Sequence, residues 1–215
     1  MRQVLTAGLV ALGLLLAGCS GSSGSKPDST STSPSELSGN DGTGLYHGVG
    51  LIPPQPRPVF TLTDTSGKSF DFGKQTAGRL TLLYFGYTHC PDICPQTMAD
   101  IALALQQVPE SVRSKVLVVF VTTDVKRDTA AVIGSWLGKF DGGLPNKFIG
   151  LTGTQEGIET AQVAAHITLA SGDGEQHSTR VLLYGSDDYA RVAFLESNDE
   201  TGQIAHDLTV VAGQK

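Results

Sequence analysis

Two uninterrupted apolar runs constrain the fold of this chain more than any other feature. Residues 80–86 (LTLLYFG) and 115–123 (KVLVVFVTT) consist mainly of aliphatic, aromatic and β-branched residues. Runs of this length and type are typical of strands buried on both faces of a sheet. Between them, Met98, Ile101 and Leu105 recur at helical spacing, which predicts a helix over about 96–108. The sequence therefore predicts a strand, a helix and a second strand at the centre of the domain.

The remaining pattern extends this core into an α/β domain over residues 45–215. The other expected strands are a hairpin from 59–63 and 69–72, a short strand at 147–151, and an antiparallel pair at 180–184 and 191–196. The other expected helices are 130–140, capped by Asp128 and Thr129, then 154–167, capped by Thr154, and 201–211. This order predicts a thioredoxin-like fold with an added N-terminal β-hairpin and a mixed central sheet flanked by helices.

The first 44 residues predict an exported, membrane-anchored protein. Residues 1–18 combine Arg2 with an apolar run that ends in small residues, as in a secretory signal peptide, and the run is too short to span a membrane comfortably. Its end, Leu-Ala-Gly-Cys, resembles a bacterial lipobox, so Cys19 is expected to become a lipidated N-terminus. Residues 19–44, rich in Gly, Ser and Thr, predict a disordered tether. We expect the domain at the extracytoplasmic face of the cell membrane, beside a membrane-bound client.

The charge pattern excludes nucleic acid as a partner. The chain has 15 Lys and Arg against 21 Asp and Glu, a formal net charge of −6. It has no basic cluster larger than Lys126-Arg127. A protein that binds a phosphate backbone needs a concentrated basic surface, which this sequence does not provide.

The sharpest chemical signal is the cysteine pair in Cys90-Pro-Asp-Ile-Cys94, which follows the first buried strand. At the start of a helix, unpaired N–H groups and the helix dipole favour thiolates. Spacing i, i+4 places both sulfurs on one helical face, where they can share a soft metal ion such as Cu(I) or zinc. Two sulfurs are too few for structural zinc or an iron–sulfur cluster, so a third ligand is expected.

His177 is the best candidate for that ligand among the five histidines. It ends the Gly- and Asp-rich loop before the strand at 180–184, and a thioredoxin-like fold brings this loop beside the first helix. The other histidines are expected to be ordinary surface or hydrogen-bonded residues. Met98 could be a thioether ligand, but its spacing with Ile101 places it on the core face of the helix.

The cysteine segment FGYTHCPDICP at residues 85–95 closely resembles FGYTxCPDxCP, the signature of the Sco/SenC copper proteins. Three further segments resemble family motifs, namely Asp124 with RDT at 127–129, FIGLTG at 148–153, and His177-Ser178. The likeness covers about residues 50–213. Val125 and Gln176 depart from the family pattern, which has Pro and Asp there, and the change at Gln176 alters the charge of the loop that carries the histidine.

The resemblance implies a copper metallochaperone with a thioredoxin-like fold. Cys90, Cys94 and His177 match the family's copper ligands one by one. The implied role is delivery of one copper ion, Cu(I) or Cu(II), to the binuclear centre of cytochrome c oxidase subunit II or a related membrane-bound copper protein. Other copper carriers are expected as further partners, and reduction of client cysteines as a second role. Asp124 is expected to orient His177, to bind a partner, or to cap its own loop.

Three other functions compete with copper delivery. A CxxxC pair in an oxidising compartment also suits a thiol-disulfide oxidoreductase. One feature argues against this function. Thiol-exchanging thioredoxin-like proteins resemble one another in having a cis-proline just before the strand that corresponds to 180–184, and this sequence has Thr179-Arg180 at that position. The sequence around Cys90 lacks the Pro-x-x-x-Thr-x-x-Cys pattern of peroxidases of the peroxiredoxin kind. A purely structural module would not need two cysteines at this spacing. We therefore expect a carrier rather than an enzyme, with no catalytic residue.

Overall fold

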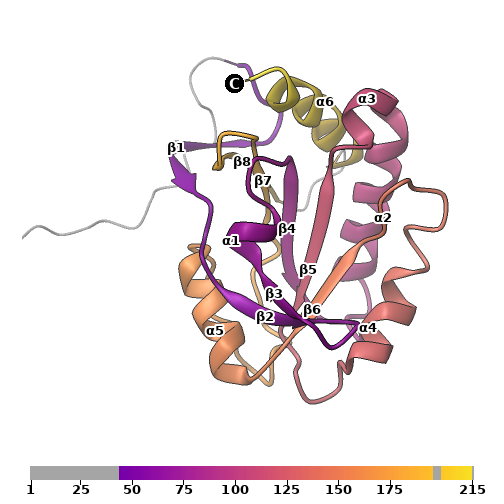
Figure 1. Cartoon of the computed structure of the whole chain (residues 1–215), viewed down its shortest axis with the longest axis vertical. Coiled ribbons are helices and arrows are strands. Elements are labelled where there is room, and N and C mark those ends of the chain that lie inside the picture. The colour runs from indigo at the N-terminus through magenta and orange to yellow at the C-terminus, as the bar shows by residue number, and fades with distance from the viewer. Residues whose placement is uncertain (1–43, 196–199, 215) are drawn as a thin grey trace, which may run out of the picture. The chain divides into compact units, whose positions relative to one another are not determined.

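The residues that the computed structural model describes, 44–195 and 200–214, form a single sheet of eight strands with helices around it (Figure 1). The strands are β1 (Val49–Pro56), β2 (Thr61–Asp64), β3 (Ser69–Asp71), β4 (Thr81–Gly86), β5 (Leu117–Thr122), β6 (Ile149–Thr152), β7 (Val181–Tyr184) and β8 (Tyr189–Phe194). The helices are α1 (Phe72–Gln75), α2 (Ile93–Gln107), α3 (Glu110–Arg113), α4 (Ala130–Leu137), α5 (Gln155–Ala164) and α6 (Glu200–Ala212). Across the sheet the order is β1-β8-β7-β4-β5-β6-β2-β3.

The two apolar runs form the middle of the sheet, as predicted. β4 and β5 pair in parallel, and every residue of both strands is buried. Helix α2 lies between them in the chain and makes the crossover connection. β6 extends the parallel part beside β5, whereas β7 runs antiparallel to β4 on its other side. The cysteine motif begins in the short turn after the carboxyl end of β4 and ends at Cys94, within α2.

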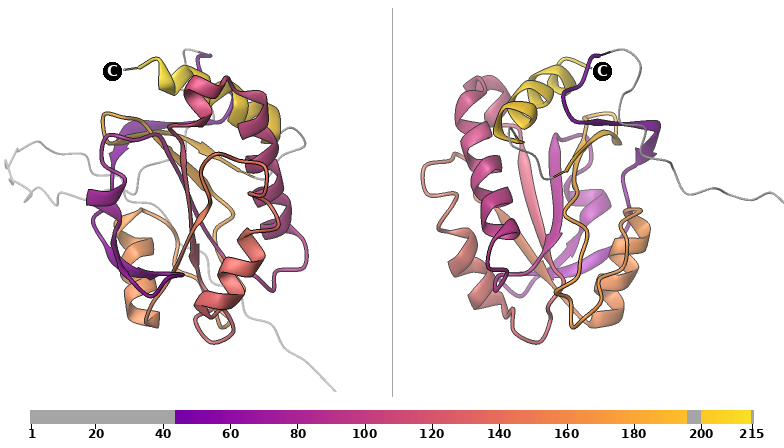
Figure 2. Two further views of the ribbon diagram at one scale, coloured as in Figure 1. Left: turned by 45° about the vertical axis from the view of Figure 1, so that its right-hand side comes forward. Right: turned by 180° about the vertical axis from the view of Figure 1, so that it is seen from behind.

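Helices cover both faces of the sheet, as the two views of Figure 2 show. Side chains of α2, α4 and α6 join one hydrophobic core, and those of α1 and α5 join the other. Strand β4 supplies Leu82 and Tyr84 to the first core and Leu83 and Phe85 to the second. Because alternate side chains of a strand point to opposite faces, a strand covered on both faces is apolar throughout.

The predicted N-terminal hairpin is confirmed, because β2 pairs antiparallel with β3 at one edge of the sheet. The opposite edge is β1, and the proline-rich sequence of residues 49–56 does not predict this strand. β1 pairs with β8, and the register shifts between Gly50 and Gln55. Proline cannot donate a hydrogen bond to a neighbouring strand, so it is tolerated at an irregular edge of this kind.

Helix boundaries differ from the predicted ones in one place that affects the site. Helix α2 begins at Ile93 rather than Gln96, so Cys94 lies within its first turn. Thr154 caps α5 as predicted, and Thr129 caps α4. The prediction that Asp128 shares the capping of α4 is wrong, because the side chain that accepts the capping hydrogen bond belongs to Thr129 alone.

The predicted signal peptide, the lipidated Cys19 and the tether up to residue 43 lie outside the described residues. Of the helices in the described ranges, none has the length and apolar character needed to cross a membrane. The boundary between tether and domain near residue 45 therefore stays a prediction from the sequence.

Candidate metal centre

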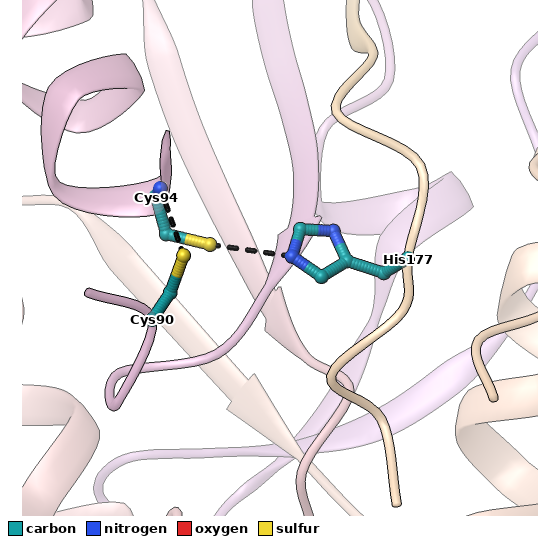
Figure 3. Close-up of side chains that lie close together, drawn as sticks. All are labelled: Cys90, Cys94 and His177. Carbon is teal, nitrogen blue, oxygen red and sulfur yellow. Dashed lines mark hydrogen bonds between the residues drawn. The ribbon is translucent and has the colours of Figure 1, made fainter. Parts of the chain in front are cut away.

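Cys90, Cys94 and His177 lie together at the carboxyl end of β4 (Figure 3). Their potential ligand atoms, two sulfurs and one imidazole nitrogen, all lie within 4.8 Å of one another. Cys94 Sγ lies 3.4 Å from His177 Nε2, although 83 positions separate the two residues along the chain. The fold thus brings together the three residues that the sequence selects as ligand candidates.

The local backbone explains how both sulfurs come to face the histidine. The Cys94 N–H, in the first turn of α2, points back to Cys90 Sγ at 3.4 Å. Cys94 is fully buried, whereas Cys90 is partly exposed. A Cβ atom at Gly86, the last residue of β4, would lie only 2.9 Å from Cys94 Sγ. The glycine of the motif therefore leaves the space that the inner sulfur occupies.

The imidazole of His177 is oriented to present a lone pair to the sulfurs. Its Nδ1 lies 2.9 Å from the Ser178 carbonyl oxygen. Because a carbonyl oxygen only accepts, Nδ1 carries the proton and Nε2 is the free nitrogen. Burial lowers the pKa of His177, although the hydrogen bond to Ser178 opposes this effect. Tyr87 contacts the ring edge-on, with 5.5 Å between ring centroids. A neutral imidazole held in this way is the form that binds metals.

The two thiols differ in their ionisation. Burial raises the pKa of Cys94 to about 12, despite a 3.3 Å hydrogen bond from the Tyr84 hydroxyl to its sulfur. Burial also acts to raise the pKa of Cys90, but hydrogen bonds from the backbone N–H groups of Cys94 and Asp92 outweigh it, so the net shift is downward. A soft metal ion that binds here must displace the Cys94 proton, and the fixed sulfur geometry favours that exchange.

This difference predicts selective alkylation of the metal-free, reduced protein. At pH 7.5 a thiol with a pKa of about 12 is ionised in fewer than about one molecule in 10⁴, so iodoacetamide should modify Cys90 at least about tenfold faster than Cys94. The rate at Cys90 should rise with pH as its thiolate forms. Fragment-ion mass spectrometry of the peptide that contains both residues measures the two rates, with Cys94→Ser as the control for Cys90. Equal reactivity of the two thiols would contradict the assignment.

The loop that carries His177 is attached to the turn after β5. The Thr123 hydroxyl donates to the Gly174 carbonyl at 2.7 Å, and this bond is buried. Two ion pairs at the surface join the same segments, Arg127 with Glu175 at 2.6 Å and Lys126 with Asp173 at 2.6 Å. The loop therefore reaches the sulfur pair from a fixed starting point on the turn after β5.

Asp124 does not contact His177 by any hydrogen bond in the part of the chain that the structure describes. Its carboxylate accepts hydrogen bonds from the backbone N–H and the guanidinium of Arg127. Arg127 in turn pairs with Glu175, two residues before His177. Asp124 therefore caps its own loop, one of the three roles expected for it, and its carboxylate is linked to the histidine loop through Arg127.

Asp128 has a structural role at the site that the sequence pattern does not reveal. Its buried carboxylate accepts from the Thr88 N–H at 2.9 Å, the Thr88 hydroxyl at 2.5 Å and the Thr122 hydroxyl at 2.7 Å. These bonds tie the turn before Cys90 to the end of β5. In the sequence, Asp128 is marked as a helix cap and by the resemblance of RDT at 127–129 to a family motif, and neither indicates these bonds.

Asp128 also lies in a second group of potential ligand atoms, with Asp124 and the exposed His89. We do not assign a metal to it. The Asp128 carboxylate already accepts from two threonines, and that of Asp124 from Arg127. Two thiol sulfurs and an imidazole, in contrast, form a donor set that suits a soft ion.

Comparison with known sequences identifies the family of this chain. The sequence pattern of SCO1/SenC matches residues 53–213. Protein SCO1 homolog 1, mitochondrial, of Arabidopsis thaliana is 38% identical over 101 residues, which are 47% of this chain and 29% of that protein. The SCO2-like protein of Rickettsia felis is 33% identical over 124 residues, 58% of either chain. The match thus spans less than two thirds of the length of both relatives.

Solved structures show the same fold. Arabidopsis thaliana ScoI with copper bound is 28% identical with a TM-score of 0.63, and the alignment covers 72% of this chain and 97% of that one. Bradyrhizobium japonicum ScoI with copper bound is 30% identical with a TM-score of 0.57, covering 72% and 98%. The predicted thioredoxin-like fold is confirmed by these matches. With the family pattern extending from the β1 strand to the end of α6, the chain belongs to the SCO1/SenC family.

Proposed function

We propose that this protein is a copper metallochaperone that binds one copper ion through Cys90, Cys94 and His177. The observation that carries the proposal is the convergence of two sulfurs with the unprotonated Nε2 of an oriented imidazole within 4.8 Å. Thiolates select Cu(I), and imidazole also suits Cu(II). Membership of the SCO1/SenC family and the copper in both ScoI structures support copper as the ion.

A set of two sulfurs and one nitrogen suits a carrier better than a permanent site. It holds Cu(I) in trigonal geometry, and Cu(II) in tetragonal geometry once an oxygen ligand is added. Cys90 is partly exposed, so a partner's ligand can reach the ion from that side while Cys94 and His177 still hold it. Stepwise ligand exchange of this kind allows transfer without release of free copper.

We further propose that the recipient is the binuclear copper centre of cytochrome c oxidase subunit II or a related membrane-bound copper protein. This follows from the resemblance of residues 85–95 to the Sco/SenC signature. In the same proposal a lipid on Cys19 and the tether of residues 19–44 keep the domain at the extracytoplasmic face of the cell membrane. Other carriers would load the copper, and the reduced cysteine pair would also convert a disulfide between client cysteines to two thiols, becoming a disulfide itself.

A thiol-disulfide oxidoreductase is the second candidate, and the lowered pKa of the partly exposed Cys90 favours it. The stretch Thr179-Arg180 argues against it. The one cis peptide bond within the described ranges precedes Pro53, so the peptide before Arg180 is trans. Thiol-exchanging proteins of this fold resemble one another in having a cis-proline beside the cysteines. This structure has no cis-proline at that position.

Copper transfer to an acceptor separates the two candidates. The reduced chain is loaded with one equivalent of copper and mixed with the soluble copper-binding domain of an oxidase subunit II, and the spectrum of the acceptor's binuclear centre is followed. His177→Ala should lower copper affinity and transfer at least about tenfold, since even partners of metal ligands have effects of 10–100-fold. His166→Asn, a change outside the cluster, should behave as the parent. Strong disulfide reductase turnover that ignores His177, with no copper retained, would instead establish the second candidate.

A further inference from the structure

A second pair of imidazoles lies on elements that contribute nothing to the Cys90 cluster. His47 precedes β1, and His206 lies on α6. Their ring centroids are 3.6 Å apart and their planes differ by 2°, so the rings are stacked. His47 is exposed and His206 is partly exposed. Two histidine rings that lie near opposite ends of the domain's sequence therefore meet at its surface.

A buried carboxylate holds this arrangement in place. Asp207 is fully buried, and its two oxygens accept from the backbone N–H groups of His47 and Gly48, each at 2.9 Å. One of these oxygens also lies 2.7 Å from His206 Nδ1. Because the carboxylate accepts, Nδ1 of His206 carries the proton, and its Nε2 keeps a free lone pair. A histidine whose other nitrogen donates to a carboxylate is the usual form of a histidine that binds a metal.

We propose that His47 and His206 form a second metal site, which takes Cu(II) through one nitrogen of each ring. Imidazole nitrogens suit Cu(II), and Cu(II) is the divalent ion that such donors bind most strongly in the first transition series. Asp207 is the positioning residue of the site, because it fixes the tautomer of His206 and the backbone of His47. Water completes the coordination.

Binding requires one rearrangement, which the surroundings permit. In stacked rings the lone pairs lie in two parallel planes and do not meet at one point. Neither ring nitrogen of His47 has a hydrogen bond to the described residues, and the side chain is exposed. Rotation about the side-chain bonds of His47 therefore opens the stack and turns one of its nitrogens toward Nε2 of His206. The bound ion would also link the start of the domain to α6.

The test uses the full chain in detergent with the first site removed by Cys90→Ser, Cys94→Ser and His177→Ala. This background is titrated with CuSO₄ at pH 7.5 in a non-coordinating buffer. Calorimetry should show one Cu(II) per chain, and electron paramagnetic resonance should show coupling to two imidazole nitrogens. His47→Ala and His206→Ala, each added to the background, should lower the affinity at least tenfold. His166→Asn is the matched control and should leave it unchanged.

Two outcomes would overturn the proposal. One is a Cu(II) signal that survives replacement of both His47 and His206, which would mean adventitious binding elsewhere on the chain. The other is absence of any bound Cu(II) in the background, in which case the histidines form only a stacked pair. Circular dichroism of each variant shows whether it is folded. If His206→Ala does not fold, His47→Ala alone still tests the site, because the His47 side chain is exposed and its replacement should not disturb the fold. The result does not depend on the proposed carrier function, since the first site is absent throughout.

Discussion

Replacing Cys94 with serine should lower Cu(I) affinity by on the order of 100-fold or more, since even outer partners of a metal ligand contribute 10–100-fold. Cys94 is the central donor of the cluster. Its sulfur lies 3.4 Å from His177 Nε2 and 3.3 Å from the Tyr84 hydroxyl, and its backbone N–H points to Cys90 Sγ. Serine retains the size and hydrogen bonding of the side chain, so the fold should persist, but a hydroxyl oxygen is a poor ligand for soft Cu(I).

Competition with a chromogenic Cu(I) chelator measures this loss. Met98→Leu is the matched control, because Met98 is the other sulfur-containing side chain of α2 and follows Cys94 by one helical turn. Met98 is fully buried in the core, and leucine preserves most of its volume. The control should bind Cu(I) as the parent does. Equal loss in both variants would show that packing of α2, rather than the Cys94 sulfur, determines the affinity.

Much of the fold could be predicted from local patterns in the sequence. β4 and β5 are apolar throughout because both faces of the sheet are covered, and that cause acts on every residue of the run. β1 could not be predicted, because its prolines argue against a strand. They are tolerated only because the strand lies at the sheet edge beside β8, a fact of tertiary structure.

Part of the candidate site could likewise be predicted from local sequence, and part depends on tertiary structure. The expectation that Cys90 and Cys94 share one helical turn is wrong for Cys90, which precedes the start of α2 at Ile93. The short separation along the chain still brings the two residues together, because the Cys94 N–H points to Cys90 Sγ. The approach of His177 depends on how the sheet orders its strands, and only its loop position and the family resemblance indicate it. The bonds from Asp128 to Thr88 join segments 40 positions apart in the chain, and no sequence period encodes such contacts.

The attachment of the His177 loop raises the question of which contact fixes it. The Arg127–Glu175 and Lys126–Asp173 pairs are solvent-exposed, and water and salt screen such pairs. The buried hydrogen bond from Thr123 to the Gly174 carbonyl is not screened in this way. Backbone contact at Gly174 should therefore determine the position of His177, more than the charges around it.

Gly174→Ala should consequently displace His177 and lower copper affinity by about 10–100-fold, the effect seen when a ligand loses its support. Gly174 has φ of +91°, where a side chain costs about 1–3 kcal/mol. A Cβ there would also lie 2.0 Å from the Thr123 carbonyl oxygen. The loop must move away from the turn after β5 to relieve this contact, and His177 lies three residues further along the loop.

Gly172→Ala is the control that separates backbone strain from the lost contact. Gly172 also has positive φ, +59°, but its Cβ would meet no atom closer than 3.7 Å. It should cost about 1–2 kcal/mol of loop strain and leave copper affinity within a few-fold of the parent. Chelator competition gives the affinities, and the thiolate-to-Cu(II) charge-transfer band reports whether His177 still binds. If Gly174→Ala retained the parent's affinity and spectrum, the hold of β5 on the histidine loop would not control the site, and the ion pairs at the surface would have to do so.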